Sequence, residues 1–204
     1  DLEIQRYAIM HKNTPVDFLI ELADNVNPDV REIVAELKNM PVETLVKLAY
    51  DVNPGVRSTV AGREDVPDYV LIKSANDIVW FVRRAVARNK NTPVDILAQL
   101  ANDIDLNVRL SVASDKNTPV DILDQLANDI DSNVRRSVAS NKNTPADILA
   151  QLADDSDKDV RIAVAEHKNT PVETLVKLAT DKHGDVYKAA TEKLSSYDIS
   201  PSSY

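Results

Sequence analysis

The sequence predicts an all-α fold, a solenoid built from short helical hairpins. Two observations carry this prediction. Composition favours helices over sheets, because only three residues are glycine while Ala, Leu, Asp and Lys are abundant. Periodicity indicates a repeat architecture, because seven prolines recur every 26 residues, at Pro15, Pro41, Pro67, Pro93, Pro119, Pro145 and Pro171.

The proline register divides the chain into equal segments. We expect one helical-repeat domain, residues 1–194, followed by a C-terminal tail, residues 195–204. Residues 1–11 align with residues 157–167 and so form a half repeat. The seven full repeats, numbered 1 to 7 in chain order, are 12–37, 38–63, 64–89, 90–115, 116–141, 142–167 and 168–193.

The first half of each repeat has the pattern of a short amphipathic helix. In repeat 4, "KNTPVDILAQLANDIDLNVRLSVASD", we expect Thr92 to cap this helix and Pro93 to take its first position. Leu97, Leu100 and Ala101 then follow at spacings of three and four, which is one apolar face.

The second half predicts another helix. Asp105 or Asn107 can cap it, the helix begins near Val108, and Val112 and Ala113 complete its buried face. Isolated helices shorter than about 12 residues are marginal in water. The repeats must therefore gain their stability by stacking on their neighbours, as in a solenoid.

The repeat resembles a known family. "NTPVDILAQLA" followed by "D-x-x-VRxxVA" is similar to the leucine-rich-repeat variant family, a relative of HEAT and armadillo repeats, over essentially the whole chain. The resemblance implies a right-handed superhelix that serves as an interaction surface. Some members carry a Cys-ligated iron–sulfur cluster ahead of their repeats. This chain has no Cys, so that cluster does not carry over and we expect no cofactor.

Two polar columns recur with the repeat. One is an arginine column in the second helix: Arg31, Arg57, Arg83, Arg109, Arg135 and Arg161, with Tyr187 in the last repeat. An aspartate lies six residues earlier in most repeats, at Asp51, Asp77, Asp103, Asp129 and Asp155. The preferred interpretation is a ladder of half-buried ion pairs that joins successive repeats and specifies their register. The alternative is a stripe that binds phosphates.

Repeat 3 departs most from the pattern. In "NDIVWFVRRAV", Val79, Trp80 and Phe81 stand where repeats 4 and 5 have an Asp, a variable residue and an Asn. Ser74 takes a core Leu position. Either an aromatic ring turns inward to fill the space beside Ser74, or the two rings are an exposed anchor for a partner, since Trp is enriched at binding hot spots. Residues 57–90 contain seven basic and four acidic residues, including Arg84 and Arg88 after the Trp.

Further candidates come from the position directly after the ladder arginine, which varies between repeats. Leu110 and Ile162 are apolar there, and are either contact points or ordinary scattered surface hydrophobics. The predicted partner-binding residues are Trp80, Phe81, Arg84, Arg88, Leu110, Arg136 and Ile162.

Several functional classes find no support in the sequence. The net charge of −9 argues against general binding to nucleic acid or anionic lipid. The alternating acids Asp155, Asp157 and Asp159 suggest a calcium loop, but the sixth position is Val160 and not Gly. The three histidines cannot form one site, and we find no catalytic triad or phosphate loop.

We therefore predict a non-enzymatic scaffold that binds another protein along its second helices, near repeat 3. The alternative is a nucleic-acid-binding or enzyme-accessory module that uses the arginine stripe. The sequence begins within a repeat and without an obvious cap. This suggests a longer array, or an N-terminal face covered by a partner or, through self-association, by another copy. No apolar run approaches the ~18 residues of a membrane span, there is no signal-peptide pattern, and we expect a cytoplasmic protein.

Overall fold

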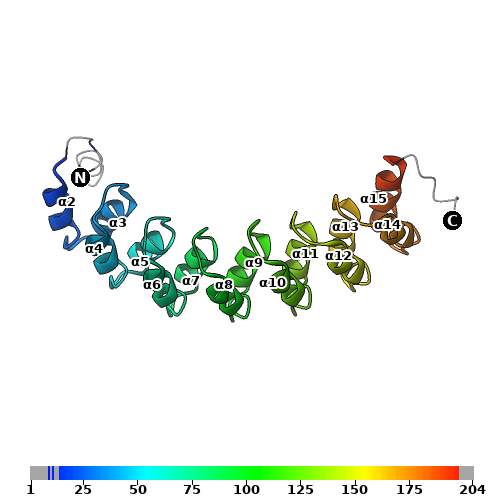
Figure 1. Ribbon diagram of the computed structural model, residues 1–204, viewed down its shortest axis with the longest axis horizontal. Helices are drawn as coiled ribbons and strands as arrows, with labels where there is room; N and C mark the ends of the chain where they lie inside the picture. Colours follow the sequence, from blue (N-terminus) through cyan, green and yellow to red (C-terminus); the bar gives the residue numbers. More distant parts are fainter. Residues whose placement is uncertain (1–8, 10, 12–13, 198–204) are drawn as a thin grey trace. The chain divides into compact units, whose positions relative to one another are not determined.

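A computed structural model describes residues 9, 11 and 14–197 of the chain (Figure 1). All regular structure in this part is α-helical, as predicted. The chain separates into two compact units, residues 1–100 and 101–204. Most of the predicted half repeat, the N-terminal face proposed for self-association, and residues 198–204 of the predicted tail lie outside the described residues.

The first unit contains the helices of repeats 1 to 3 and the first helix of repeat 4. The second helices α3, α5 and α7 pack against one another in sequence order. The helices are α2 (Val16–Leu22), α3 (Pro28–Glu36), α4 (Val42–Leu48), α5 (Pro54–Ala61), α6 (Asp68–Ser74), α7 (Trp80–Ala87) and α8 (Val94–Leu100).

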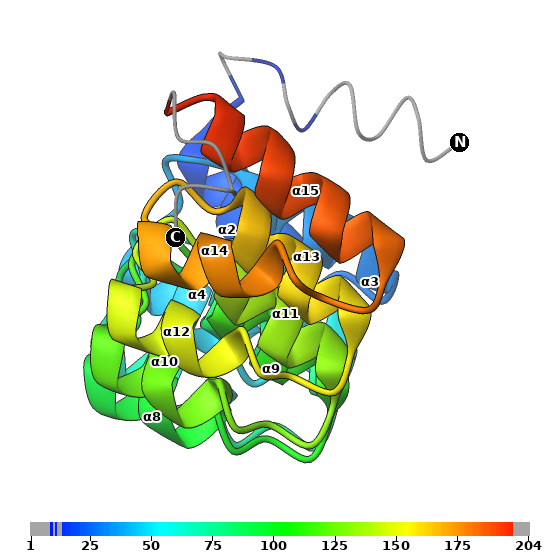
Figure 2. The same cartoon turned by 90° about the vertical axis from the view of Figure 1, so that its right-hand side faces the viewer.

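The second unit continues the pattern. Figure 2 shows its helices in two rows, with α10, α12 and α14 in one and the remaining four in the other. Its helices are α9 (Leu106–Ser114), α10 (Val120–Leu126), α11 (Ser132–Ser140), α12 (Ala146–Leu152), α13 (Lys158–Glu166), α14 (Val172–Leu178) and α15 (Gly184–Ser195).

The first helix of each repeat starts one residue later than predicted. Helix α8 begins at Val94, and the carbonyl of Pro93 accepts from the backbone N–H groups of Ile96 and Leu97. The prediction that Thr92 caps this helix is wrong. Its hydroxyl instead donates to the carbonyl of Val86, 2.6 Å away in the preceding helix. Thr118, Thr144 and Thr170 make the same bond in later repeats.

The second helices have side-chain N-caps. Of the two residues proposed for repeat 4, Asp105 is the cap, and its carboxylate accepts from the backbone N–H of Asn107. Asn27, Asn53, Asp131 and Asp157 cap their helices in the same way. Helices α7 and α15 are exceptions. Val79 occupies the N-cap position of α7 and offers no side-chain acceptor, and His183 at the N-cap of α15 makes no side-chain cap bond.

The core is built from aliphatic side chains that recur with the repeat. In repeat 4, Leu97, Leu100, Ala101, Val108 and Val112 are all buried, which confirms the two predicted apolar faces. Most of the equivalent residues in the other repeats are buried as well, among them Leu45, Leu48, Val56, Val60, Leu123, Leu126, Val134 and Val138. Each helical pair thus buries its apolar faces against its neighbours, as stacking requires.

A polar side chain at the end of several second helices ties the helix to the preceding repeat. The amide of Asn89 donates to the carbonyls of Ala61 and Arg63, and the amide of Asn141 does the same in the second unit. At the same position, Arg63 donates to the carbonyls of Ala35 and Leu37, and His167 Nε2 bonds the carbonyl of Asn141. These bonds satisfy carbonyls that a helix end leaves without intrahelical partners.

Candidate interaction surface

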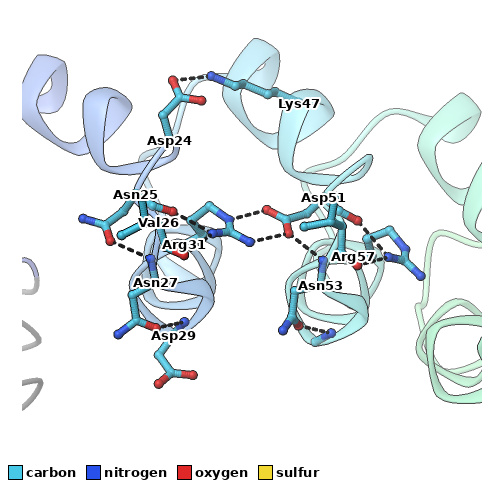
Figure 3. A network of polar contacts seen from close by, with 12 residues as sticks. Asp24, Asn25, Val26, Asn27, Asp29, Arg31, Lys47, Asp51, Asn53 and Arg57 are labelled. Atoms are coloured by element: carbon cyan, nitrogen blue, oxygen red, sulfur yellow. Dashed lines mark hydrogen bonds and ion pairs between the residues drawn. The ribbon is translucent and has the colours of Figure 1, made fainter.

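The arginine and aspartate columns meet between successive repeats. Arg57 donates from Nε and Nη2 to the two carboxylate oxygens of Asp77, 20 residues later, at 2.7 and 2.9 Å. Its Nη1 donates to the carbonyls of Asp51 and Val52, in the loop ahead of its own helix. Figure 3 shows the equivalent pair of Arg31 and Asp51. One guanidinium therefore fixes its own loop and binds the next one.

This geometry recurs along both units. The carboxylate pairs are Arg31–Asp51, Arg57–Asp77, Arg109–Asp129, Arg135–Asp155 and Arg161–Asp181. Arg83 donates to the carbonyls of Asp77 and Ile78 in the same manner, and Asp103 accepts from the backbone N–H of Asp105.

The electrostatics of the ladder favour the charged forms. Burial alone would raise the pKa of Asp77, but the hydrogen bonds from Arg57 and from the backbone of Val79 lower it below its usual value. The Arg161 guanidinium lowers the pKa of Asp181. The Asp77 hydrogen bond raises the pKa of Arg57. Both partners therefore stay ionised at neutral pH.

The arginines of the proposed phosphate-binding stripe already use their hydrogen-bond donors in the ladder. Each of Arg31, Arg57, Arg109, Arg135 and Arg161 uses Nε, Nη1 and Nη2 for bonds within the protein. A phosphate would have to displace bidentate carboxylate contacts, which are among the strongest hydrogen bonds in proteins. The geometry is that of a structural element.

The aromatic pair of repeat 3 lies at the start of α7. Trp80 keeps 36% of its surface exposed, whereas Phe81 is half-buried. Their rings form an edge-to-face pair with centroids 5.8 Å apart and planes at 87°, a favoured aromatic geometry. Phe81 also touches repeat 2, where Ser58 Oγ donates to its carbonyl at 3.4 Å.

Basic side chains extend this surface along α7. The guanidinium carbon of Arg84 lies 6.0 Å from the Trp80 ring centroid, at the outer limit of a cation–π contact. Arg88 follows one turn later and is exposed. We call Trp80, Phe81, Arg84 and Arg88 the α7 patch. It presents a large aromatic surface bordered by positive charge.

Ser74 is buried at the end of α6, in the column where other repeats have Leu. Its hydroxyl oxygen has no hydrogen-bond partner among the described residues. An unpaired buried hydroxyl costs free energy. Repeat 3 therefore combines an exposed Trp with a weakened core position.

The other predicted partner-binding residues lie in the second unit. Leu110 and Ile162 are half-buried and Arg136 is exposed. Ile162 lines an open depression of about 620 Å³ with Lys188 and Glu192 of α15. Within that unit, they lie on successive second helices, α9, α11 and α13.

A recurrent exposed apolar position was missed by the sequence analysis. It follows the ladder aspartate, or Asn25 in repeat 1, in the loop between the two helices of a repeat. Val26, Val52 and Ile78 in the first unit are 96%, 90% and 92% exposed. Ile104 and Ile130 occupy the same position in repeats 4 and 5 and are equally exposed. In repeats 6 and 7 the position is polar, with Ser156 and Lys182. The available signal was a β-branched residue recurring inside a polar turn.

Other kinds of site are not found within the described part of the chain. None of its groups of His, Asp and Glu has an arrangement that could hold a metal ion. Asp155 and Asp157 accept backbone N–H bonds within their loop. Among residues 9, 11 and 14–197, no helix is long and apolar enough to cross a membrane.

Sequence and structure comparisons define the class of protein as a helical-repeat scaffold. The profile of the leucine rich repeat variant family matches residues 80–105, 133–157 and 159–183. One similar solved structure is described as "a leucine-rich repeat variant with a novel repetitive protein structural motif". The alignment covers 93% of this chain and 80% of that protein, with 31% sequence identity and a TM-score of 0.73. The chain belongs to the leucine-rich repeat variant family.

More distant likenesses are also found. The structure of the Escherichia coli protein YibA aligns with 22% sequence identity and a TM-score of 0.44. The alignment covers 95% of this chain and 74% of YibA. An engineered protein matches with 18% identity and a TM-score of 0.45, over 91% of this chain and 68% of its own. No curated protein sequence matches the chain.

Proposed function

We propose that the chain is a non-enzymatic scaffold that binds another protein through the α7 patch. The observation that carries the proposal is the environment of Trp80, which is more than one-third exposed and lies beside Arg84. Trp and Arg are the residues most enriched at binding hot spots. A cytoplasmic location is part of the proposal, since the chain has no cysteine for disulfides.

The α7 patch is suited to a partner with acidic and aromatic groups. Residues 57–90 carry seven basic and four acidic residues, in a chain with a net charge of −9. Arg57 is paired in the ladder, but Arg88 is exposed at the end of α7. Such local positive charge steers an acidic partner and adds specificity.

The alternative function, nucleic-acid binding through the arginine stripe, is not favoured by any observation. It would use guanidiniums that already bind the carboxylates and loop carbonyls of the ladder. The acidic chain would also oppose binding to phosphates.

A random-peptide phage library tests the proposal. Peptides enriched on the wild-type chain should bind Trp80→Ala and Arg84→Glu about tenfold more weakly or worse, which is about 1.4 kcal/mol. Matched controls are Leu106→Ala, at the Trp80 position of repeat 4, and Lys188→Glu, at the Arg84 position of repeat 7. Unchanged binding by both α7 variants, with their helical content intact, would reject the α7 patch.

A further inference from the structure

The exposed loop residues of the first unit form a regular apolar edge. Val26, Val52 and Ile78, which we call the edge stripe, each lie at the same position of successive repeats. Their exposed fractions, all at least 90%, make them the most exposed large apolar residues of that unit. Single exposed apolar residues are ordinary, but three in register on adjacent repeats form an ordered surface.

The backbone beneath the edge stripe is held in place. The carbonyls of Val26, Val52 and Ile78 accept hydrogen bonds from Nη1 of Arg31, Arg57 and Arg83, at 3.2 to 3.3 Å. Figure 3 shows the first two of these loops. The edge is therefore formed before any partner arrives, which reduces the entropy lost on binding.

The fold itself does not require an apolar residue there. Ser156 occupies the same position in repeat 6, and its carbonyl accepts from Arg161 Nη1 at 3.2 Å, just as in the first unit. Lys182 occupies it in repeat 7. Because polar residues are compatible with the loop, the packing of the chain does not require the aliphatic side chains of repeats 1 to 3.

General helix-packing distances give the stripe an expected spacing that matches an extended polyproline II segment. Adjacent helices pack about 8–10 Å apart, and α3, α5 and α7 are packed neighbours. A polyproline II helix advances about 9.3 Å every three residues and presents every third side chain to the same face. Exposed aromatic rings adjoin the stripe in sequence, Tyr50 before Val52 and Trp80 after Ile78. Grooves that bind such segments are commonly lined by aromatic rings.

The charges at the two ends of the stripe differ. Beside Val26, Asp29 is an exposed acid, and Asp24 is exposed but paired with Lys47. Beyond Ile78, Arg84 and Arg88 follow on α7. A complementary segment carries a basic residue at the repeat 1 end and an acidic residue at the repeat 3 end.

We propose that the edge stripe docks an extended, proline-rich segment of a partner protein, with an aliphatic side chain at every third residue and this distribution of charge. The proposal rests on the proposed function in that the partner is a protein. Its apolar contacts are made by the loop residues, and the α7 residues Trp80, Arg84 and Arg88 only border them. Substitutions in the loops and in the α7 patch therefore test the two proposals separately.

Fluorescence anisotropy with a synthetic peptide tests the proposal. The probe is a fluorescein-labelled peptide of three Ile-Pro-Pro units with Lys at one end and Glu at the other, prepared also with the two end residues exchanged. A control peptide has Ser in place of each Ile. We expect the better Ile peptide to bind about tenfold or more tightly than its Ser counterpart, since aliphatic burial supplies the affinity.

Variants then locate the binding. Val26→Ser, Val52→Ser and Ile78→Ser, combined in one chain, should weaken binding of the Ile peptide about tenfold or more. The fold should persist, because Ser occurs naturally at this position in repeat 6. Val42→Ser with Val94→Ser, exposed apolar residues at the starts of α4 and α8, is the control and should leave binding unchanged.

Two results would overturn the proposal. One is equal affinity for the Ile and Ser peptides with both arrangements of the ends. The other is unchanged affinity of the triple variant while circular dichroism shows the wild-type helical content. If library peptides still depend on Trp80 in either case, the proposed function stands and only the edge stripe fails.

Discussion

Arg57 of one repeat holds Asp77 of the next through two hydrogen bonds, and holds the carbonyls of Asp51 and Val52 through its third nitrogen. Both side chains are largely buried, with 12% and 5% of their surfaces exposed. A single arginine thus joins two loops and two repeats. The stacking of repeats depends on the integrity of these contacts as well as on apolar burial.

We expect Asp77→Ala to lower the free energy of unfolding by about 3 kcal/mol, because it leaves the largely buried Arg57 without its carboxylate. Asp24→Ala is the control. Its partner Lys47 is half exposed and Asp24 itself is 67% exposed. Exposed pairs contribute about 0.2–1 kcal/mol. Urea denaturation followed by circular dichroism measures both. Similar losses for the two variants would contradict the structural role of the ladder.

The arginine ladder also shows which contacts a sequence can indicate. The two columns were visible as a 26-residue pattern, but the pairing of Arg57 with the aspartate 20 residues later depends on how repeats stack. The hydroxyl of Thr92 was assigned to the wrong helix, since a Thr between two helices can bond either one. The recurrence of a β-branched residue at the Val52 position was visible in the sequence. Its exposure was not, because such a residue in a turn can point inward or outward.

The threonine column should contribute to stability through its buried hydrogen bond. Thr144→Val leaves the buried carbonyl of Val138 without the hydroxyl donor, and we expect a loss of about 1 kcal/mol. Valine fits this position, since Val66 is buried there in repeat 3. Thr180→Val, where the hydroxyl is exposed, should change stability by less than about 0.5 kcal/mol. Chemical denaturation of both variants measures their free energies of unfolding. Equal stability of Thr144→Val and wild type would refute the expectation.

His167 should make the stability of the second unit pH-dependent. Its Nδ1 accepts from the backbone N–H of Asn169, and its Nε2 lies 3.0 Å from the carbonyl of Asn141, so the ring is held neutral. Burial lowers its pKa below the usual 6.5, and Lys168 and Lys193 lower it further, against the opposing effect of the Asn141 carbonyl. The folded state binds fewer protons than the unfolded state below pH 6.5, so stability is complete above that pH and falls as the pH drops toward the lowered pKa.

His167→Asn is the matched variant, because Asn141 makes the equivalent bonds one repeat earlier. We expect it to lose part of the stability decrease seen between about pH 7 and about pH 5 in urea denaturation. The same decrease in wild type and variant would show that His167 does not titrate as described.

Substitution of Ser74 should raise the stability of the fold. Its hydroxyl is buried without a partner, and Ser74→Ala removes the unsatisfied group with little change in volume. We expect the variant to be more stable by about 1 kcal/mol. Ser195→Ala is the control, since that hydroxyl is exposed and bonded within its helix. A destabilised Ser74→Ala, measured by thermal unfolding, would mean that the hydroxyl has a favourable contact in solution.

The fluorescence of the single tryptophan tests the central claim, that the α7 patch binds a protein partner, most directly. Trp80 is more than one-third exposed, so acrylamide should quench its emission readily in the free chain. Titration with a non-fluorescent, tryptophan-free peptide selected from the library should shift the emission to shorter wavelength and protect it from acrylamide, because binding removes the ring from water. Saturable binding with unchanged emission and unchanged quenching would contradict the claim.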